Sequence, residues 1–248
     1  MIPLRRDPIP SRGAPSLVQR GPHPPGQDEP CPEGPQSPRD SPGSLRDPGL
    51  PAGPGILVMD LAYRPGSLSA DEFVAPVERI VQQEGFATRV KHYTEATRED
   101  CTPAAGVILC GTALADSGYL ERMDRFSWLP SFSRPVLGIC AGMQVIAKAF
   151  GGKVFPGAGI GMAGQEVMAP DPLLAGKDRF EAYELHSLSV APPPSFRVLA
   201  ISPSGAGIIR HPDRPVYGVM FHPEVRNEWL VRRFLNLCRP AGKDGDRL

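Results

Sequence analysis

The sequence predicts an α/β fold with a mainly parallel central sheet, covering helices and a small antiparallel section. Between residues 55 and 152, apolar runs typical of buried strands alternate with apolar residues at helical spacing. One of these runs, AGVILC at residues 105–110, is apolar throughout, as expected of a central parallel strand. After residue 152, short segments of alternating polarity are separated by Gly and Pro, a pattern typical of antiparallel hairpins.

The domain organisation follows from a change in composition near residue 54. Residues 1–54 are rich in Pro, Gly, Ser, Arg and Asp and lack apolar periodicity, so we expect a disordered Pro-rich tail. Its proline runs could instead bind a partner as a polyproline helix, or the segment could reflect an over-extended start site. One folded domain is expected over residues 55–240, followed by a frayed polar end at 241–248.

Composition excludes several classes of function. The 27 basic and 27 acidic side chains give a formal net charge of zero, which does not favour nucleic-acid binding. No apolar run approaches the ~20 residues that span a bilayer, and the N-terminus lacks the apolar core of a secretory signal. The five cysteines are odd in number and scattered, which argues against a disulfide framework and a zinc site. We therefore expect a cytoplasmic protein that binds neither membrane nor metal.

The first elements follow in order along the chain. Residues 55–60 form an apolar first strand, and Ser69 followed by Glu72 matches a capping box at the start of a helix. Apolar residues at helical spacing continue to residue 81, and Gly85 ends the helix. A second strand is expected at residues 86–93 and the third at 105–110.

The stretch at residues 135–152, PVLGICAGMQVIAKAFGG, predicts a strand, a sharp turn and a buried helix. Cys140 stands in the turn between Gly138 and Gly142, the arrangement of a nucleophile elbow with sulfur in place of oxygen. The start of the helix directs free N–H groups at Cys140, which favours the thiolate. Taken alone, the pattern would fit a buried structural cysteine equally well.

A second candidate group lies at residues 215–224, PVYGVMFHPE. The apolar residues predict another central strand, which ends at His222 because Pro223 cannot donate to a sheet. Residues two apart on an extended chain point to the same side, so Glu224 can hold the ring of His222 towards Cys140. Without the cysteine elbow, a histidine that caps a turn would be the better interpretation.

Between these two groups, residues 153–202 predict antiparallel strands. Five short segments are expected: 153–155, 165–169, 179–183, 187–191 and 197–202. The glycine-rich run at residues 157–161 is interpreted as a flexible turn, because it neither opens a helix nor ends in the G-K-[ST] of a phosphate loop. Residues 205–210 lead into the His222 strand, and apolar residues at 229–237 predict a closing helix.

The run GICAGMQ followed by FHPE resembles the class I (triad-type) glutamine amidotransferases over about residues 55–238. The likeness is nearest to the glutaminase subunit of two-chain GMP synthases. It implies a flavodoxin-like, three-layer fold in which Cys140 is the nucleophile, His222 the general base and acid, and Glu224 the orienting carboxylate.

The resemblance also implies an oxyanion hole. By position, the N–H of Thr112 after the bend at Gly111 would be one donor, and the N–H of Ala141 the other. Members of the family often carry a Gly-Gly or Pro-Gly pair here, so the β-branched Thr112 is a departure that restricts the peptide flip. A plain turn between a strand and a loop is the alternative.

Four residues are candidates for binding the substrate. Gln144 lies one helical turn after Cys140, where its amide could bind the amide of glutamine, although a solvated helix residue would show the same spacing. The run His186-Ser187-Leu188 resembles a segment whose backbone holds the α-amino and carboxylate groups of glutamine in anthranilate- and aminodeoxychorismate-type members. A structural role for His186 in a strand turn remains an alternative.

The activity that the resemblance implies is hydrolysis of glutamine through a Cys thioester, with no metal or organic cofactor. Ammonia would pass to a synthase on a separate chain, which could be ATP-dependent. The two-chain GMP synthases usually have a Ser-His and acidic pattern where this chain has residues 185–188, LHSL, so the acceptor stays open. The alternatives are a stand-alone hydrolase of γ-glutamyl peptides and a catalytically silent regulatory subunit.

Overall fold

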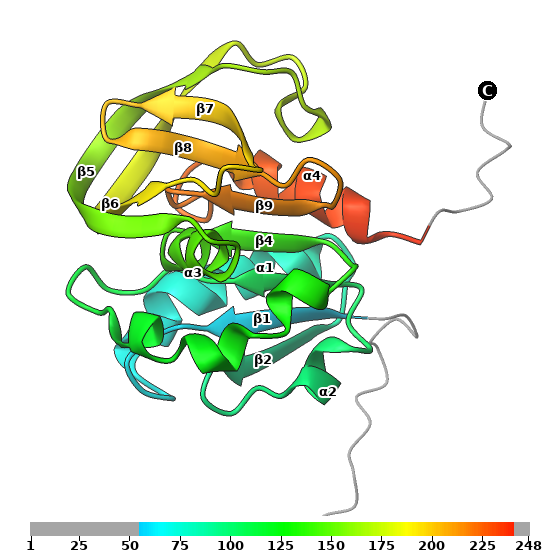
Figure 1. The fold of residues 1–248 in the computed structure, drawn as a ribbon. Helices are drawn as coiled ribbons and strands as arrows, with labels where there is room; N and C mark the ends of the chain where they lie inside the picture. Colours follow the sequence, from blue (N-terminus) through cyan, green and yellow to red (C-terminus); the bar gives the residue numbers. More distant parts are fainter. Residues whose placement is uncertain (1–54, 241–248) are drawn as a thin grey trace, which may run out of the picture. The chain divides into compact units, whose positions relative to one another are not determined.

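The computed structural model describes residues 55–240, so the predictions for the tail at 1–54 and for the end at 241–248 lie outside the described residues. A single nine-stranded sheet runs through the described part in the order β2-β1-β3-β4-β9-β8-β7-β5-β6 (Figure 1). The first five strands in this order are parallel neighbours. They are β2 (Thr88–His92), β1 (Ile56–Asp60), β3 (Gly106–Leu109), β4 (Val136–Ile139) and β9 (Val216–Val219).

The antiparallel section continues the same sheet beyond β9. Its strands are β8 (Gly205–Arg210), β7 (Arg197–Ser202), β5 (Lys153–Val167) and β6 (Arg179–Ala191). The two sections meet at the pair β9–β8, next to β4. The parallel strands β4 and β9 therefore lie side by side at the centre of the sheet, and each carries one half of the candidate site at its C-terminal end.

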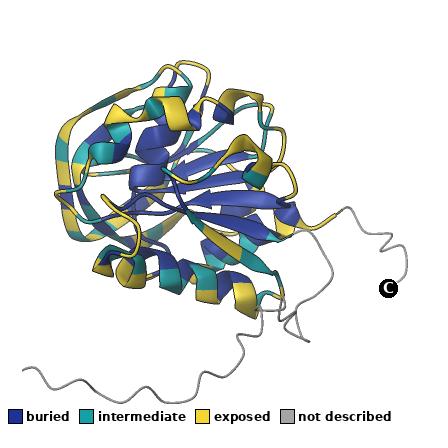
Figure 2. Cartoon of the chain, turned by 90° about the horizontal axis from the view of Figure 1, so that it is seen from below, coloured by how far each residue is buried: buried dark blue, intermediate teal, exposed yellow. Residues whose placement is uncertain are grey.

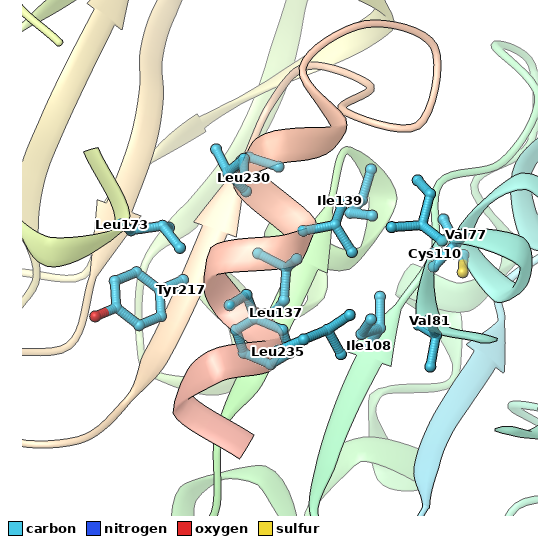
Figure 3. Close-up of a cluster of buried hydrophobic side chains, with 14 of the residues drawn as sticks. Val77, Val81, Ile108, Cys110, Leu137, Ile139, Leu173, Tyr217, Leu230 and Leu235 are labelled. Atoms are coloured by element: carbon cyan, nitrogen blue, oxygen red, sulfur yellow. The ribbon is translucent and has the colours of Figure 1, made fainter. Parts of the chain in front are cut away.

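Helices cover both faces of the parallel strands β1, β3, β4 and β9, which explains their largely apolar sequences, whereas the edge strand β2 is partly exposed. Residues Ile56 and Val58 of β1 pack in one buried cluster with α1 (Ala75–Gln83) and α4 (Glu228–Cys238), part of which Figure 3 shows. Residues Leu57 and Met59 pack in a second cluster with α3 (Ala141–Ala149). Strands β1, β3, β4 and β9 are accordingly buried (Figure 2), and the predicted three-layer α/β architecture is confirmed.

Short helical segments complete the covering layers. They are a π-helical turn at Ala70–Val74, helix α2 (Arg98–Cys101), and 3₁₀ turns at Gly118–Glu121, Met123–Phe126, Leu129–Ser131 and Pro172–Leu174. Within residues 55–240, none of the helices has the length and apolar character that crossing a membrane requires.

The capping box predicted at Ser69 and Glu72 is wrong. Ser69 itself has helical backbone angles, and its side chain makes no capping hydrogen bond. A π-helical turn precedes α1, and Pro76 lies in the first turn of α1, where its missing N–H interrupts the regular ladder. A reciprocal capping box occurs instead at the start of α2, between Thr97 and Asp100.

The antiparallel strands are longer than predicted. Residues 153–167 form one strand instead of two segments, and residues 179–191 do the same. The glycine-rich run at 157–161 lies inside β5, where the register shifts between Pro156 and Gly159, so its interpretation as a turn is wrong. Gly157 and Gly159 serve close packing, because a Cβ on Gly157 would lie 2.5 Å from Oγ of Ser189 and one on Gly159 would lie 2.3 Å from Oε2 of Glu184.

Candidate active site

Cys140 occupies the turn between β4 and α3 in a strained conformation. Its backbone has φ 49° and ψ −102°, a combination that L-residues rarely adopt. The residue is 4 % exposed, its N–H donates to the carbonyl of Val219 on β9, and its thiol lies 3.6 Å from the carbonyl oxygen of Leu185. The turn therefore fixes the sulfur at the C-terminal edge of the parallel strands, as the elbow pattern predicts.

The two glycines beside Cys140 allow the strand and the helix to approach closely. A Cβ on Gly138 would lie 2.4 Å from the carbonyl of Gly142. A Cβ on Gly142 would lie 2.3 Å from the carbonyl oxygen of Leu109 on β3. Neither glycine has a positive φ, so the backbone strain of the elbow falls on Cys140 itself.

His222 and Glu224 meet as the spacing of two residues predicts. The Nδ1 atom of His222 lies 2.7 Å from Oε1 of Glu224, and both side chains are fully buried. An ionised Glu224 carboxylate can only accept hydrogen bonds, so Nδ1 of His222 carries the proton. The second ring nitrogen, Nε2, therefore remains available to exchange a proton with another group. Phe73 packs against the imidazole with ring centroids 5.3 Å apart. The ring is thus held on two sides.

The electrostatics of the site link His222 to Cys140. Burial lowers the pKa of His222, but the nearby Cys140 and the interaction with Glu224 raise it well above its ordinary value of 6.5. Cys140 and His222, which are 82 positions apart in sequence, therefore lie near enough for Cys140 to influence the pKa of His222.

Gly111 leaves room for the imidazole. A Cβ on Gly111 would lie 2.6 Å from Cε1 of His222 and 3.1 Å from its Nδ1. We expect Gly111→Ala to push the ring aside and to lower kcat by about 10- to 100-fold, because small misplacements of a reacting group cost that much.

A matched control for this change is Gly164→Ala, where an added Cβ meets nothing within 4 Å. Steady-state kinetics of both variants check the prediction, together with their melting temperatures. Equal activities of the two variants would show that the position of the ring does not depend on Gly111.

The predicted oxyanion donors line a small cavity with Cys140. Thr112 is 3 % exposed, and its hydroxyl donates to Asp116 at 2.9 Å, which anchors the loop after β3. Ala141 begins α3, where the first N–H groups have no acceptor within the helix. The cavity beside them has a volume of about 10 Å³, roughly the space of one water molecule.

Gln144 also faces this cavity, with its amide oriented by two partners. Its Nε2 donates to the carbonyl of Leu188 at 3.0 Å, and the hydroxyl of Tyr119 donates to its Oε1 at 2.5 Å. Gln144, Tyr119 and Leu188 line the same cavity as Cys140 and the predicted oxyanion donors. Gln144 is 2 % exposed, so the interpretation as a solvated helix residue is wrong.

The residues His186, Ser187 and Leu188 line the cavity beside Cys140. Ser187 donates to the carbonyl of Leu114 at 3.0 Å and so connects β6 to the loop after β3. The ring of His186 instead makes polar contacts with Gly157 and Glu184. The contacts of the His186 side chain therefore fit the structural alternative, and a role of the segment in binding glutamine stays a prediction.

Glu184 is a buried carboxylate next to this segment. Burial raises its pKa, but hydrogen bonds with His186, Ser202, Ser204 and Gln165 lower it to about 2. A carboxyl group whose pKa is lowered by folding stabilises the folded state at pH values above its pKa in the unfolded chain, which is near 4.5. This contribution is lost as the pH falls towards the folded pKa of about 2.

We therefore expect the stability advantage of the wild type over Glu184→Gln to shrink between pH 6 and pH 2, by on the order of 3 kcal/mol. Urea unfolding of both proteins across this range measures the difference. A constant difference would contradict the depressed pKa.

Three contributors to the site escaped the sequence analysis. Tyr119 sits in a 3₁₀ turn without periodicity, and the carbonyl of Leu185 carries no side-chain signal. Glu184 could have been found, because it precedes His186 by two residues on a strand, the same relation that identified Glu224 and His222.

Comparisons with known proteins agree with this geometry. The family model Glutamine amidotransferase class-I matches residues 69–236. The glutamine-hydrolyzing GMP synthase subunit of Methanothrix thermoacetophila is 40% identical over 148 residues, which cover 56% of this chain and 82% of that protein. The subunit of the same name from Pyrococcus abyssi is 36% identical over 146 residues, covering 55% of this chain and 76% of that protein.

A solved structure shows the same fold. A Thermoplasma acidophilum protein described as one subunit of a GMP synthase superimposes with a TM-score of 0.67 at 23% identity, covering 75% of this chain and 94% of that one. The family model spans most of the chain, and the Methanothrix relative is covered over most of its length. The chain therefore belongs to the class I glutamine amidotransferase family. The resemblance found in the sequence is confirmed.

Proposed function

We propose that residues 55–240 form a glutaminase domain that hydrolyses glutamine and supplies ammonia to a synthase on a separate chain. The observation that carries the proposal is the strained elbow at Cys140 together with a buried His222 whose Nδ1 lies 2.7 Å from Oε1 of Glu224. Relatives named as glutamine-hydrolyzing subunits of GMP synthase support GMP synthesis as the ammonia-consuming reaction.

The proposed mechanism uses groups of this chain alone. The thiolate of Cys140 attacks the side-chain amide carbon of glutamine, and the N–H groups of Thr112 and Ala141 bind the oxyanion that forms. The imidazolium of His222 gives its proton to the leaving nitrogen, which departs as ammonia and leaves a thioester. Neutral His222 then takes a proton from water, which attacks the thioester and releases glutamate. Glu224 orients the ring throughout.

The amide of Gln144 supports recognition of glutamine. Tyr119 and Leu188 hold this amide in one orientation beside the cavity, and each of its two polar atoms keeps one further hydrogen-bonding position. A pocket that pairs both groups of a substrate amide rejects analogues that lack one of them. The site is therefore suited to a primary amide beside the sulfur.

Measuring substrate preference tests the proposal. The purified chain is assayed for glutamate and ammonia from glutamine and, at equal concentration, from γ-glutamyl dipeptides, with and without the synthase chain of a two-chain GMP synthase. We expect preference for glutamine, and transfer of ¹⁵N from its amide into GMP when the synthase is present. Preference for dipeptides would favour a stand-alone hydrolase, and no turnover with either would favour a silent regulatory protein.

Tyr119→Phe tests the recognition of the substrate amide. Removing the hydroxyl leaves Oε1 of Gln144 buried without its donor, so the amide can turn, and we expect kcat/KM for glutamine to fall by about 10-fold. The control is Tyr93→Phe, because Tyr93 is also buried but stacks on Phe126. A fall of equal size in both variants would indicate a general packing effect.

A further inference from the structure

One segment of β6 contacts three parts of the site through its backbone. Three carbonyl oxygens of this segment accept hydrogen bonds from residues that the proposed mechanism uses. The carbonyl of Tyr183 accepts from the N–H of His222 at 2.8 Å. The carbonyl of Leu185 accepts from the thiol of Cys140 at 3.6 Å, and that of Leu188 accepts from the amide of Gln144 at 3.0 Å. The path of this segment therefore affects how the nucleophile, the base and the substrate amide lie relative to one another.

A buried polar cluster lies against the side chains of this segment. Glu184 and His186 are 1 % and 2 % exposed. The carboxylate of Glu184 accepts from Nε2 of Gln165 at 2.9 Å and from the hydroxyl of Ser204 at 2.8 Å. Nε2 of His186 lies 3.6 Å from the same carboxylate. Both oxygens of Glu184 are thus fixed by strand β5 and by the turn between β7 and β8.

The ring of His186 ties the segment to the irregular part of β5. Its Nδ1 lies 3.1 Å from the carbonyl oxygen of Gly157, which only accepts, so Nδ1 donates. A Cβ on Gly159 would lie 2.3 Å from Oε2 of Glu184 and 2.5 Å from Nε2 of His186. Glycine in β5 and the polar pair in β6 therefore depend on each other.

Stability alone is a poor reason for this cluster, because replacing buried charged or polar groups by apolar side chains of similar volume often costs no stability. A directional network instead fixes one backbone path, since each bond requires its own geometry. We propose that Glu184 and His186 are positioning residues, which hold the carbonyls of Tyr183, Leu185 and Leu188 where Cys140, His222 and Gln144 need them. This inference rests on the proposed glutaminase function.

The test compares Glu184→Gln with Asp171→Asn. Asp171 is a suitable control because its side chain is fully buried and pairs with Arg210 and with the N–H of Leu173, outside the site. Two reagents alkylate the sulfur of Cys140, with loss of iodide from iodoacetamide or of dinitrogen from a γ-diazoketone analogue of glutamine. Only the second reagent requires recognition of glutamine. Mass spectrometry gives the labelling rate for each.

We expect Glu184→Gln to slow the glutamine analogue at least about 10-fold more than it slows iodoacetamide, whereas Asp171→Asn changes this ratio by less than about twofold. His186→Asn, which can keep a donor near Nδ1, should retain more of the ratio than His186→Leu. Equal ratios in Glu184→Gln and Asp171→Asn would overturn the proposal.

Two further measurements keep the outcomes distinct. If Glu184→Gln does not fold, as judged by circular dichroism, Ser204→Ala removes one of the bonds to the carboxylate and is compared in the same way. An unchanged ratio in Ser204→Ala would then overturn the positioning role. If the analogue fails to label the wild type while iodoacetamide labels it, the proposed glutaminase function itself fails.

Discussion

Replacing Cys140 with alanine is expected to abolish glutamine hydrolysis, by about 10⁴-fold or more in kcat. Within the described residues no other thiol can take its place, because Cys101, Cys110 and Cys238 have pKa values that burial raises. The fold should persist, since the thiol makes only a weak bond to the carbonyl of Leu185.

The measurement is glutamate release together with thermal unfolding, and Cys101→Ala is the control because Cys101 lies in α2 and is equally buried. Retention of activity in Cys140→Ala, with the control also active, would reject Cys140 as the nucleophile. The same variant has a second expected property. Without the charge of Cys140 the pKa of His222 should fall, which NMR titration of its ring protons detects.

The second large effect is expected from His222→Asn. Asparagine can still donate to Glu224 from near the position of Nδ1, but it cannot carry a proton from Cys140 to the leaving nitrogen. We expect kcat to fall by about 10³-fold or more, with a smaller change in KM. The near-isosteric choice keeps the buried carboxylate of Glu224 paired, so the loss reports chemistry and not unfolding.

His211→Asn serves as the matched control, because His211 lies outside the site after β8. The pH dependence of unfolding gives an independent check. Because folding raises the pKa of His222, its protonated form stabilises the folded state, and this contribution is complete below the unfolded pKa of 6.5. The contribution is lost as the pH rises through the higher pKa that His222 has in the folded protein. The stability difference between the wild type and His222→Asn should therefore shrink at alkaline pH. A difference that grows instead would contradict the charged pair.

Local patterns in the sequence were sufficient for the central part of the site. The strand, turn and helix around Cys140 lie within 18 consecutive residues, and the relation between His222 and Glu224 needs only the alternation of a strand. Both features are set by neighbours along the chain. Four of the five parallel strands, β1, β3, β4 and β9, were found for the same reason, because burial on both faces leaves a largely apolar run.

Features that depend on packing between distant segments were missed. Tyr119 reaches Gln144 from a 3₁₀ turn that has no periodicity. The glycines at 157 and 159 suggested a turn, yet they accommodate Ser189, Glu184 and His186 of the neighbouring strand. A glycine required by its partner strand cannot be distinguished from a flexible glycine until the pairing of β5 with β6 is known.

The backbone angles of Cys140 have a consequence for protein engineering. Glycine tolerates a positive φ that strains any other residue, so selection for heat resistance alone would favour glycine at this position. Such a substitution would raise the thermal stability of the protein while removing the proposed nucleophile. Libraries designed to make this chain more robust should therefore keep codon 140 fixed and screen for turnover as well as for survival on heating.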